Sequence, residues 1–158
     1  MRPFRLTSAK PLQRLGTTAV EVAVTMPVFL AFAFGLMECS HAMMVVDSLD
    51  SAARQAARYG SVDKITSAQT VTKAQALIAQ SFRVVPTVVV KDASVFDTAG
   101  YDATNLNYST LPNKELSTAT ADQMFIVRIS VPYNSIALLP PFWIKNITLN
   151  GQAVMRHE

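Results

Sequence analysis

The sequence predicts an α+β protein: a long N-terminal transmembrane helix continues into a small domain with a second helix and a short antiparallel β-sheet. An apolar run follows a basic tail, a helical repeat continues beyond that run, and the last part alternates apolar and polar residues. A chain of 158 residues has room for one membrane segment and one small domain. We expect a basic cytoplasmic leader over 1–16, a transmembrane helix over 17–46 and an extracytoplasmic domain over 47–158.

The apolar run extends from Val22 to Val46, and Glu38 is its first charged residue. As a helix it would be about 37 Å long at about 1.5 Å per residue, enough to cross a hydrocarbon core of roughly 30 Å. Basic residues precede the run, and Asp47 and Asp50 follow it. This asymmetry predicts a cytoplasmic N-terminus and an outer C-terminal domain.

Glu21 stands at the start of the apolar run, five residues after Gly16. A carboxylate in a membrane segment is costly and therefore indicates a functional site. An ordinary anchor is the alternative, with Glu21 reaching the cytoplasmic interface at little cost. A cleaved secretory or lipoprotein signal fits less well, because no clear Ala-x-Ala cleavage site follows and an acid, Glu38, directly precedes Cys39.

Three residues of the run, Pro27, Ala31 and Gly35, bear on the shape and packing of the helix. Pro27 lacks an N–H donor and predicts a helix kink, although membrane helices also tolerate proline without such a role. Ala31 and Gly35 are four residues apart, a spacing that permits close packing of membrane helices and also occurs by chance.

Beyond Val46 the helical repeat continues through an alanine-rich stripe, and Gly60 is expected to cap the helix. A second helix is expected over 61–82. The period then changes to two, which predicts strands over 84–90, 124–131 and 144–155. Pro86 delays the first strand or marks it as an edge, and Asn150-Gly151 indicates a bulge or a tight hairpin turn.

Two polar connections separate these strands. Residues 97–123 are rich in Ser, Thr, Asn and Asp, and so long a connection is either a contact surface for another component or a solvated loop. Residues 134–143 include Phe142 and Trp143, which would sit at the membrane interface or pack in the core.

Composition excludes several classes of function. The net charge is +3, but the basic excess lies in the N-terminal tail, so no nucleic-acid partner is expected. The single cysteine, Cys39, excludes an intramolecular disulfide, and we expect a buried free thiol rather than an intermolecular disulfide. Glu38 and His41 share a helix face, but two ligands are too few, so no metal or cofactor is expected. No phosphate-binding loop or Ser-His-Asp pattern is present, so we expect no catalytic residues and no enzyme.

Residues around Glu21 and two later stretches of the chain also form a pattern that is typical of one protein family. The relevant stretches are Leu15-Gly16-Thr17-Thr18-Ala19-Val20-Glu21 with Pro27 and Glu38, Ala52-Ala53-Arg54-Gln55-Ala56-Ala57-Arg58-Tyr59-Gly60, and the C-terminal Gln152-Ala153-Val154-Met155-Arg156-His157-Glu158. They resemble the TadE-like family of minor pseudopilins from the tight-adherence (Flp) type IVb pilus system. In that family a basic leader ends in glycine, and glutamate is the fifth residue of the mature chain. Val22 departs from the pattern, which often has an aromatic residue there.

The resemblance implies a minor pseudopilin that assists pilus assembly or function. A prepilin peptidase would cleave between Gly16 and Thr17, and Glu21 would act in processing or in pairing with a neighbouring subunit. The implied partners are that peptidase, other pilins or pseudopilins, the inner-membrane assembly platform and membrane lipid. The protein would reside in the bacterial inner membrane or in the pilus. The alternative is an uncleaved single-pass anchor whose outer domain binds a partner in an envelope complex.

Overall fold

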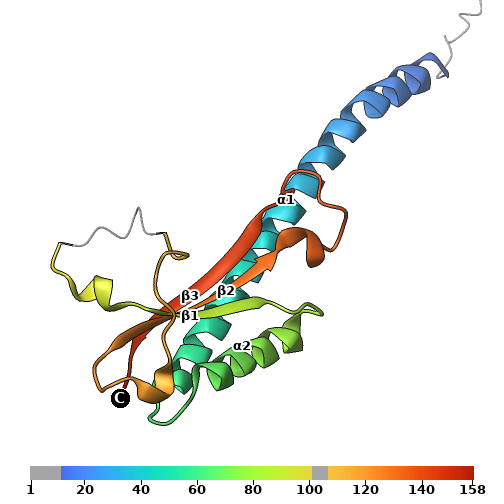
Figure 1. Ribbon diagram of the computed structural model, residues 1–158. Coiled ribbons are helices and arrows are strands. Elements are labelled where there is room, and N and C mark those ends of the chain that lie inside the picture. Colours follow the sequence, from blue (N-terminus) through green and yellow to red (C-terminus); the bar gives the residue numbers. More distant parts are fainter. Residues whose placement is uncertain (1–11, 101–106) are drawn as a thin grey trace, which may run out of the picture. The chain divides into compact units, whose positions relative to one another are not determined.

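The computed structural model describes residues 12–100 and 107–158 (Figure 1). It confirms the α+β class, with two long elements of helix and a three-stranded antiparallel sheet. The chain divides after Met37 into the N-terminal part of the first helix and a compact unit, Glu38–Glu158. The elements are α1 (Leu12–Gly60), α2 (Ser67–Ser81), β1 (Thr87–Asp92), β2 (Met124–Pro132) and β3 (Thr148–Arg156), with short 3-10 helices η1 (Ser94–Asp97), η3 (Leu116–Thr118) and η4 (Tyr133–Ser135).

The first unit consists of α1 up to Met37. Side chains over residues 16–34 are all exposed. Within the described residues, one helical stretch, Gly16–Gly60, is long and apolar enough to cross a membrane, and its most apolar window has a mean hydropathy of 2.0 with no buried residue. An exposed apolar helix of this length indicates a single-pass membrane protein.

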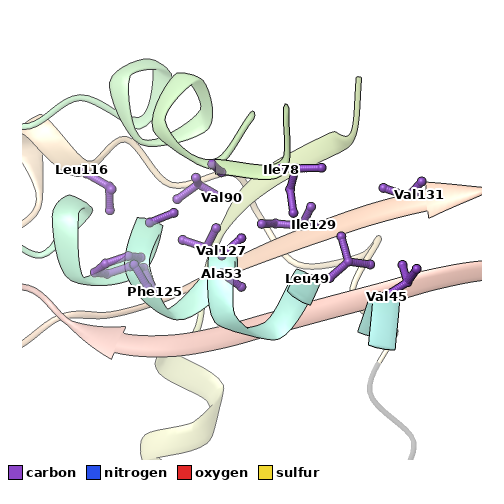
Figure 2. Packing of buried hydrophobic residues seen from close by; sticks show 14 residues of the cluster. Val45, Leu49, Ala53, Ile78, Val90, Leu116, Phe125, Val127, Ile129 and Val131 are labelled. Carbon is purple, nitrogen blue, oxygen red and sulfur yellow. The ribbon is translucent and has the colours of Figure 1, made fainter. Parts of the chain in front are cut away.

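The sheet of the compact unit has the order β1-β2-β3. Both pairings are antiparallel, with Val90 opposite Val127 and Val127 opposite Ala153. Alternate residues of β2 point to one face, where α2 and the second part of α1 cover them (Figures 1 and 2). The buried core on this face includes Val45, Leu49, Ala53, Ile78, Val90, Phe125, Val127, Ile129 and Val131.

The alanine stripe of α1 has a structural role. Ala52, Ala53, Ala56 and Ala57 are almost completely buried against the sheet and α2. Small side chains let the helix axis approach the strands closely, so the predicted stripe is confirmed as a packing face. Packing begins at His41 and Ala42, within the segment 17–46 that the sequence assigns to the membrane.

Two glycines permit this close packing. The helix ends at Gly60 as predicted, but the predicted bulge or turn at Gly151 is wrong. Gly60 is the last residue of α1 and does not have the positive φ of a left-handed cap. A Cβ there would lie 2.7 Å from Thr70 Oγ1. At Gly151 a Cβ would lie 2.5 Å from the Asp50 backbone nitrogen. Asn150 and Gly151 pair regularly with β2, so they form neither a bulge nor a hairpin turn.

The second helix begins later than predicted, at Ser67 rather than at 61. Thr66 is the reason, since its hydroxyl accepts from the Gln69 N–H while the Gln69 side chain accepts from the Thr66 N–H. This reciprocal capping box gives hydrogen-bond partners to backbone N–H groups at the first turn of the helix. A helix that began at 61 would not have the box at its start. Ala68, expected on the apolar side, is exposed.

The strand boundaries also shift. β1 starts at Thr87, directly after Pro86, and is an edge strand, as that proline predicts. β3 starts at Thr148 rather than at 144. Residues 144–147 belong instead to the connection that follows η4, because the Ile144 N–H donates to the Glu38 carboxylate and not to a neighbouring strand.

Part of the predicted 97–123 loop is packed rather than solvated; residues 101–106 of it lie outside the described residues. Leu111 and Leu116 are buried, and Lys91 and Asn113 form an isolated antiparallel β-bridge. The Glu115 carboxylate accepts from the Ser67 N–H at the start of α2, where the helix dipole favours an anion. The Ser67 and Ser117 N–H groups hold the pKa of Glu115 below its usual value.

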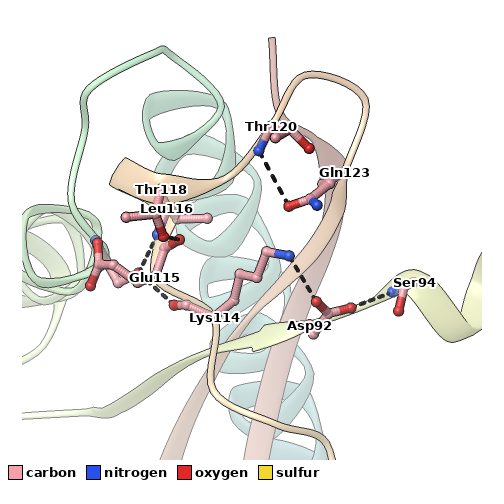
Figure 3. A network of polar contacts seen from close by, with 9 residues as sticks. Asp92, Ser94, Lys114, Glu115, Leu116, Thr118, Thr120 and Gln123 are labelled. Atoms are coloured by element: carbon pink, nitrogen blue, oxygen red, sulfur yellow. Dashed lines mark hydrogen bonds and ion pairs between the residues drawn. The ribbon is translucent and has the colours of Figure 1, made fainter.

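Lys114 and Asp92 form a partly buried ion pair of 2.8 Å that fastens this segment to β1 (Figure 3). Burial raises the pKa of Asp92, but hydrogen bonds from Lys114 and Ser94 outweigh it and lower the pKa from 3.8 to about 2. A carboxyl group whose pKa is lower in the folded than in the unfolded protein stabilises the fold at pH values above its unfolded pKa. This stability is lost as the pH falls through its folded pKa.

We therefore expect the free energy of unfolding to fall by up to about 2 kcal/mol between about pH 5 and pH 2 through Asp92. Asp92→Asn should remove this part of the pH dependence. Urea titrations of the detergent-solubilised protein across this range would measure it, with Asp63→Asn at an exposed position as the control. An unchanged pH slope in Asp92→Asn would contradict the expectation.

Candidate functional site on the N-terminal helix

The predicted cleavage junction lies inside α1, which starts at Leu12. Gly16 and Thr17 are exposed. A Cβ added to Gly16 would meet nothing within 4 Å, in contrast to Gly60 and Gly151. Nothing in the described part of the chain therefore requires glycine at position 16, whereas close packing requires it at the other two positions.

Glu21 lies one helical turn beyond Thr17 and is exposed among apolar neighbours. Its backbone carbonyl accepts from the Thr25 hydroxyl at 2.9 Å, a local bond that leaves the carboxylate uninvolved. Residues four apart share a helix face. Thr17 and Glu21 therefore lie on the same face of the helix.

The remaining predicted site residues continue along the same exposed helix. Pro27 lies within α1, and the helix continues through it. Ala31 is exposed and Gly35 is partly exposed, one turn apart on one face. These small residues offer a smooth surface for another helix, and their role as a packing face stays a prediction.

A polar cluster forms where the compact unit begins. The Glu38 carboxylate accepts from the Trp143 N–H at 2.9 Å and from the Ile144 N–H at 3.0 Å. The Tyr133 hydroxyl donates to the Glu38 carbonyl at 3.2 Å and lies 3.4 Å from His41 Nδ1. Burial raises the pKa of Tyr133, so its hydroxyl remains a donor at neutral pH. The cluster fastens a loop to the helix.

Cys39 is exposed, so the prediction of a buried thiol is wrong. Packing against the sheet begins only at His41 and Ala42, just beyond it. No group of three or more potential metal ligands occurs in residues 12–100 and 107–158. Glu38 and His41 instead contact the loop and Tyr133 respectively.

Sequence reasoning missed a basic groove between α1 and α2. Arg54 and Arg58 from α1 and Lys73 from α2 line a hollow of about 470 Å³, together with the aromatic ring of Tyr59. The spacing of the two arginines was visible in the sequence, but only the packing of α2 on α1 brings Lys73 beside them. The groove is an exposed cationic surface on the compact unit.

The comparison with known families matches this part of the chain. Residues 16–58 fit the family model described as TadE-like protein. This segment is TadE-like. The match begins at Gly16 and ends within the alanine stripe, so it confirms the resemblance found from the sequence over the membrane helix and its continuation. No curated protein and no solved structure matches the chain at a significant level.

The TadE-like match does not extend to the sheet. Residues 59–158 lie outside it, including the C-terminal stretch that also resembles the family. A TadE-like segment suggests a role in tight-adherence (Flp) pilus systems.

Proposed function

We propose that the protein is a minor pseudopilin of a tight-adherence pilus, processed by a prepilin peptidase and acting through protein–protein contacts. The observation that carries this proposal is that the TadE-like match starts at Gly16, on an apolar helix whose side chains are exposed up to residue 34. Such a helix needs lipid or another protein around it.

The environment of Gly16 supports a role in recognition. The chain itself would accept a larger residue there, so the need for glycine comes from outside it. Without a side chain, the backbone can approach the carboxylates of an aspartyl peptidase closely. Glycine also weakens a helix by about 1 kcal/mol relative to alanine, which makes local unwinding of the bond easier.

Cleavage would consume one water. Its oxygen attacks the Gly16 carbonyl carbon, the bond from that carbon to the Thr17 nitrogen breaks, and the nitrogen takes up protons. The products are a Gly16 carboxylate on the released leader and an ammonium group at Thr17. The new cation lies about 6 Å along the helix axis from Glu21.

Glu21 then has a role in assembly. A lone carboxylate in hydrocarbon costs several kcal/mol, and pairing it with a cation removes much of that penalty. The Thr17 ammonium of a neighbouring subunit is a suitable partner. A subunit alone in the membrane would thus be less favourable than one packed against another, with Ala31 and Gly35 allowing a close approach.

The proposed setting is the bacterial inner membrane, with the N-terminus in the cytoplasm and the compact unit outside.

The basic groove of Arg54, Arg58 and Lys73 is the surface we assign to contacts with other pilus components or the assembly platform. A groove with three cations favours an acidic partner surface.

The mass of the protein from membranes with and without the prepilin peptidase tests this proposal. We expect a mature chain that starts at Thr17, and we expect Gly16→Ala to accumulate the uncleaved form because its methyl group blocks the peptidase. Val28→Ala, at an exposed position of the same helix away from the junction, is the control and should be processed normally.

Glu21→Gln separates processing from assembly in the same experiment. If Glu21 pairs subunits, the variant should be recovered with much less of the other pilins after crosslinking, whether or not it is cleaved. A wild-type chain that keeps residues 1–16 in a strain with active peptidase would contradict the proposal. It would leave the uncleaved anchor as the better interpretation.

A further inference from the structure

The loop between β2 and β3 carries an unusual set of exposed apolar side chains. Leu138 is 70% exposed, Phe142 68% and Trp143 61%, and Leu139 is also exposed. Core packing, one of the two sequence expectations for the aromatic pair, is therefore wrong. A cluster of large apolar side chains this exposed marks a surface that contacts something other than water.

This loop lies beside α1 (Figure 1), to which hydrogen bonds hold it. The Trp143 and Ile144 N–H groups donate to the carboxylate of Glu38, the residue that directly follows Met37 in the chain. Met37 is the last residue of the first unit, in which the side chains of α1 are largely exposed. The loop is thus fastened where the apolar helix ends and the compact unit begins.

The loop backbone suits contact with lipid. Pro140 and Pro141 have no N–H group, and those of Trp143 and Ile144 are bound to Glu38. Backbone donors without partners are what normally keeps irregular chain segments out of a membrane. Most of the donors over 140–144 are therefore absent or satisfied, which lowers the cost of placing this segment against acyl chains.

The side chains have the chemistry of the membrane interface. Phe142 and Trp143 form an edge-to-face pair with centroids 5.3 Å apart. Lys145 Nζ lies 5.6 Å from the centre of the Phe142 ring. Aromatic rings favour the headgroup level, and a lysine beside them can reach lipid phosphates.

We propose that residues 138–145 form an interfacial foot that rests in the outer surface of the phospholipid bilayer, where α1 leaves it. Leu138, Leu139, Phe142 and Trp143 enter the boundary between headgroups and acyl chains, and Lys145 faces the phosphates. Glu38 sets the depth of the foot by binding its backbone. The hydrocarbon span then ends at Met37 rather than at 46.

Trp143 is the only tryptophan of the chain, so its fluorescence tests the proposal directly. The full-length protein is reconstituted into phosphatidylcholine vesicles with or without lipids brominated near the headgroup end of the acyl chain. We expect the brominated lipids to remove most of the Trp143 emission, and aqueous acrylamide to have little effect. Strong acrylamide quenching without bromine quenching would overturn the proposal.

Matched single-tryptophan variants provide the controls. Trp143→Phe with Val62→Trp places the probe beyond the other end of α1, roughly 33 Å along the helix from Glu38, and should show only acrylamide quenching. Trp143→Phe with Phe29→Trp places it in the apolar helix and should be quenched by brominated lipid. Loss of that second signal would mean that α1 does not span the bilayer.

Two further results test whether lipid or protein covers the side chains of the foot. Protection of Trp143 from both quenchers would mean that protein covers it, such as a second copy of the chain, and would overturn the lipid assignment. Leu138→Ser with Phe142→Ser should weaken the bromine quenching of Trp143, and unchanged quenching would contradict their insertion. The inference rests on membrane insertion of α1 and not on cleavage at Gly16, so the two proposals can fail separately.

Discussion

Replacing Gly151 with alanine is expected to lower the free energy of unfolding by about 3 kcal/mol. The new Cβ would lie 2.5 Å from the Asp50 backbone nitrogen and would also clash with the Leu49 carbonyl carbon. Both atoms belong to the backbone of α1, which cannot rotate away as a side chain can. Either α1 or β3 has to move, and the buried contacts of Leu49 are lost.

Urea titration of the full-length protein in detergent, followed by circular dichroism, would measure this effect. Gly60→Ala is the matched control, because its Cβ would meet the side chains of Thr70 and Leu116 instead of backbone. These buried side chains have to shift, but they can move more easily than backbone, and alanine favours the helix by up to about 1 kcal/mol, so a smaller loss of about 1 to 2 kcal/mol is expected. Equal effects of the two variants would contradict the close approach of β3 to α1.

Leu116→Ala is expected to destabilise the fold by about 3 kcal/mol, although Leu116 belongs to a segment whose composition resembles a surface loop. Its side chain is fully buried in the main core, where it packs beside Gly60. Its N–H donates to the Ser67 hydroxyl at the start of α2. Removing the side chain leaves a cavity where this segment, α1 and α2 meet.

Leu138→Ala is the comparison for this prediction, since the same change at a 70% exposed position should alter the free energy of unfolding by no more than about 0.5 kcal/mol. The same urea titrations apply. A small effect of Leu116→Ala would mean that residues 107–118 are not part of the core. They would then be available as a solvated contact surface, as the sequence alone allows.

Local patterns were sufficient for much of the membrane helix. Gly16, Glu21 and the charge-free run lie within a short stretch of the chain, so their spacing is visible without a structure. The alanine stripe was visible for the same reason, because a helix of fixed period converts spacing into a face. The TadE-like match covers this locally patterned part of the chain.

Contacts between distant residues were not predictable in this way. Nothing near Gly151 in the sequence shows that the backbone at Asp50 crosses it, and the Asn-Gly pair carries a misleading turn signal. Glu38 lies more than 100 residues from Trp143 and Ile144, to which it is bound. The basic groove likewise needs Lys73 of α2 beside Arg54 of α1.

The residue order alone thus established an apolar helix with a carboxylate at its start, a mixed helix and strand domain, and the resemblance to TadE-like proteins. These features depend on periods and spacings of a few residues. Tertiary packing alone decided why Gly60 and Gly151 are glycines, which loop residues are buried, and where Phe142 and Trp143 lie. The physical reason is that these outcomes depend on shape and hydrogen bonding between segments that only the folded chain brings together.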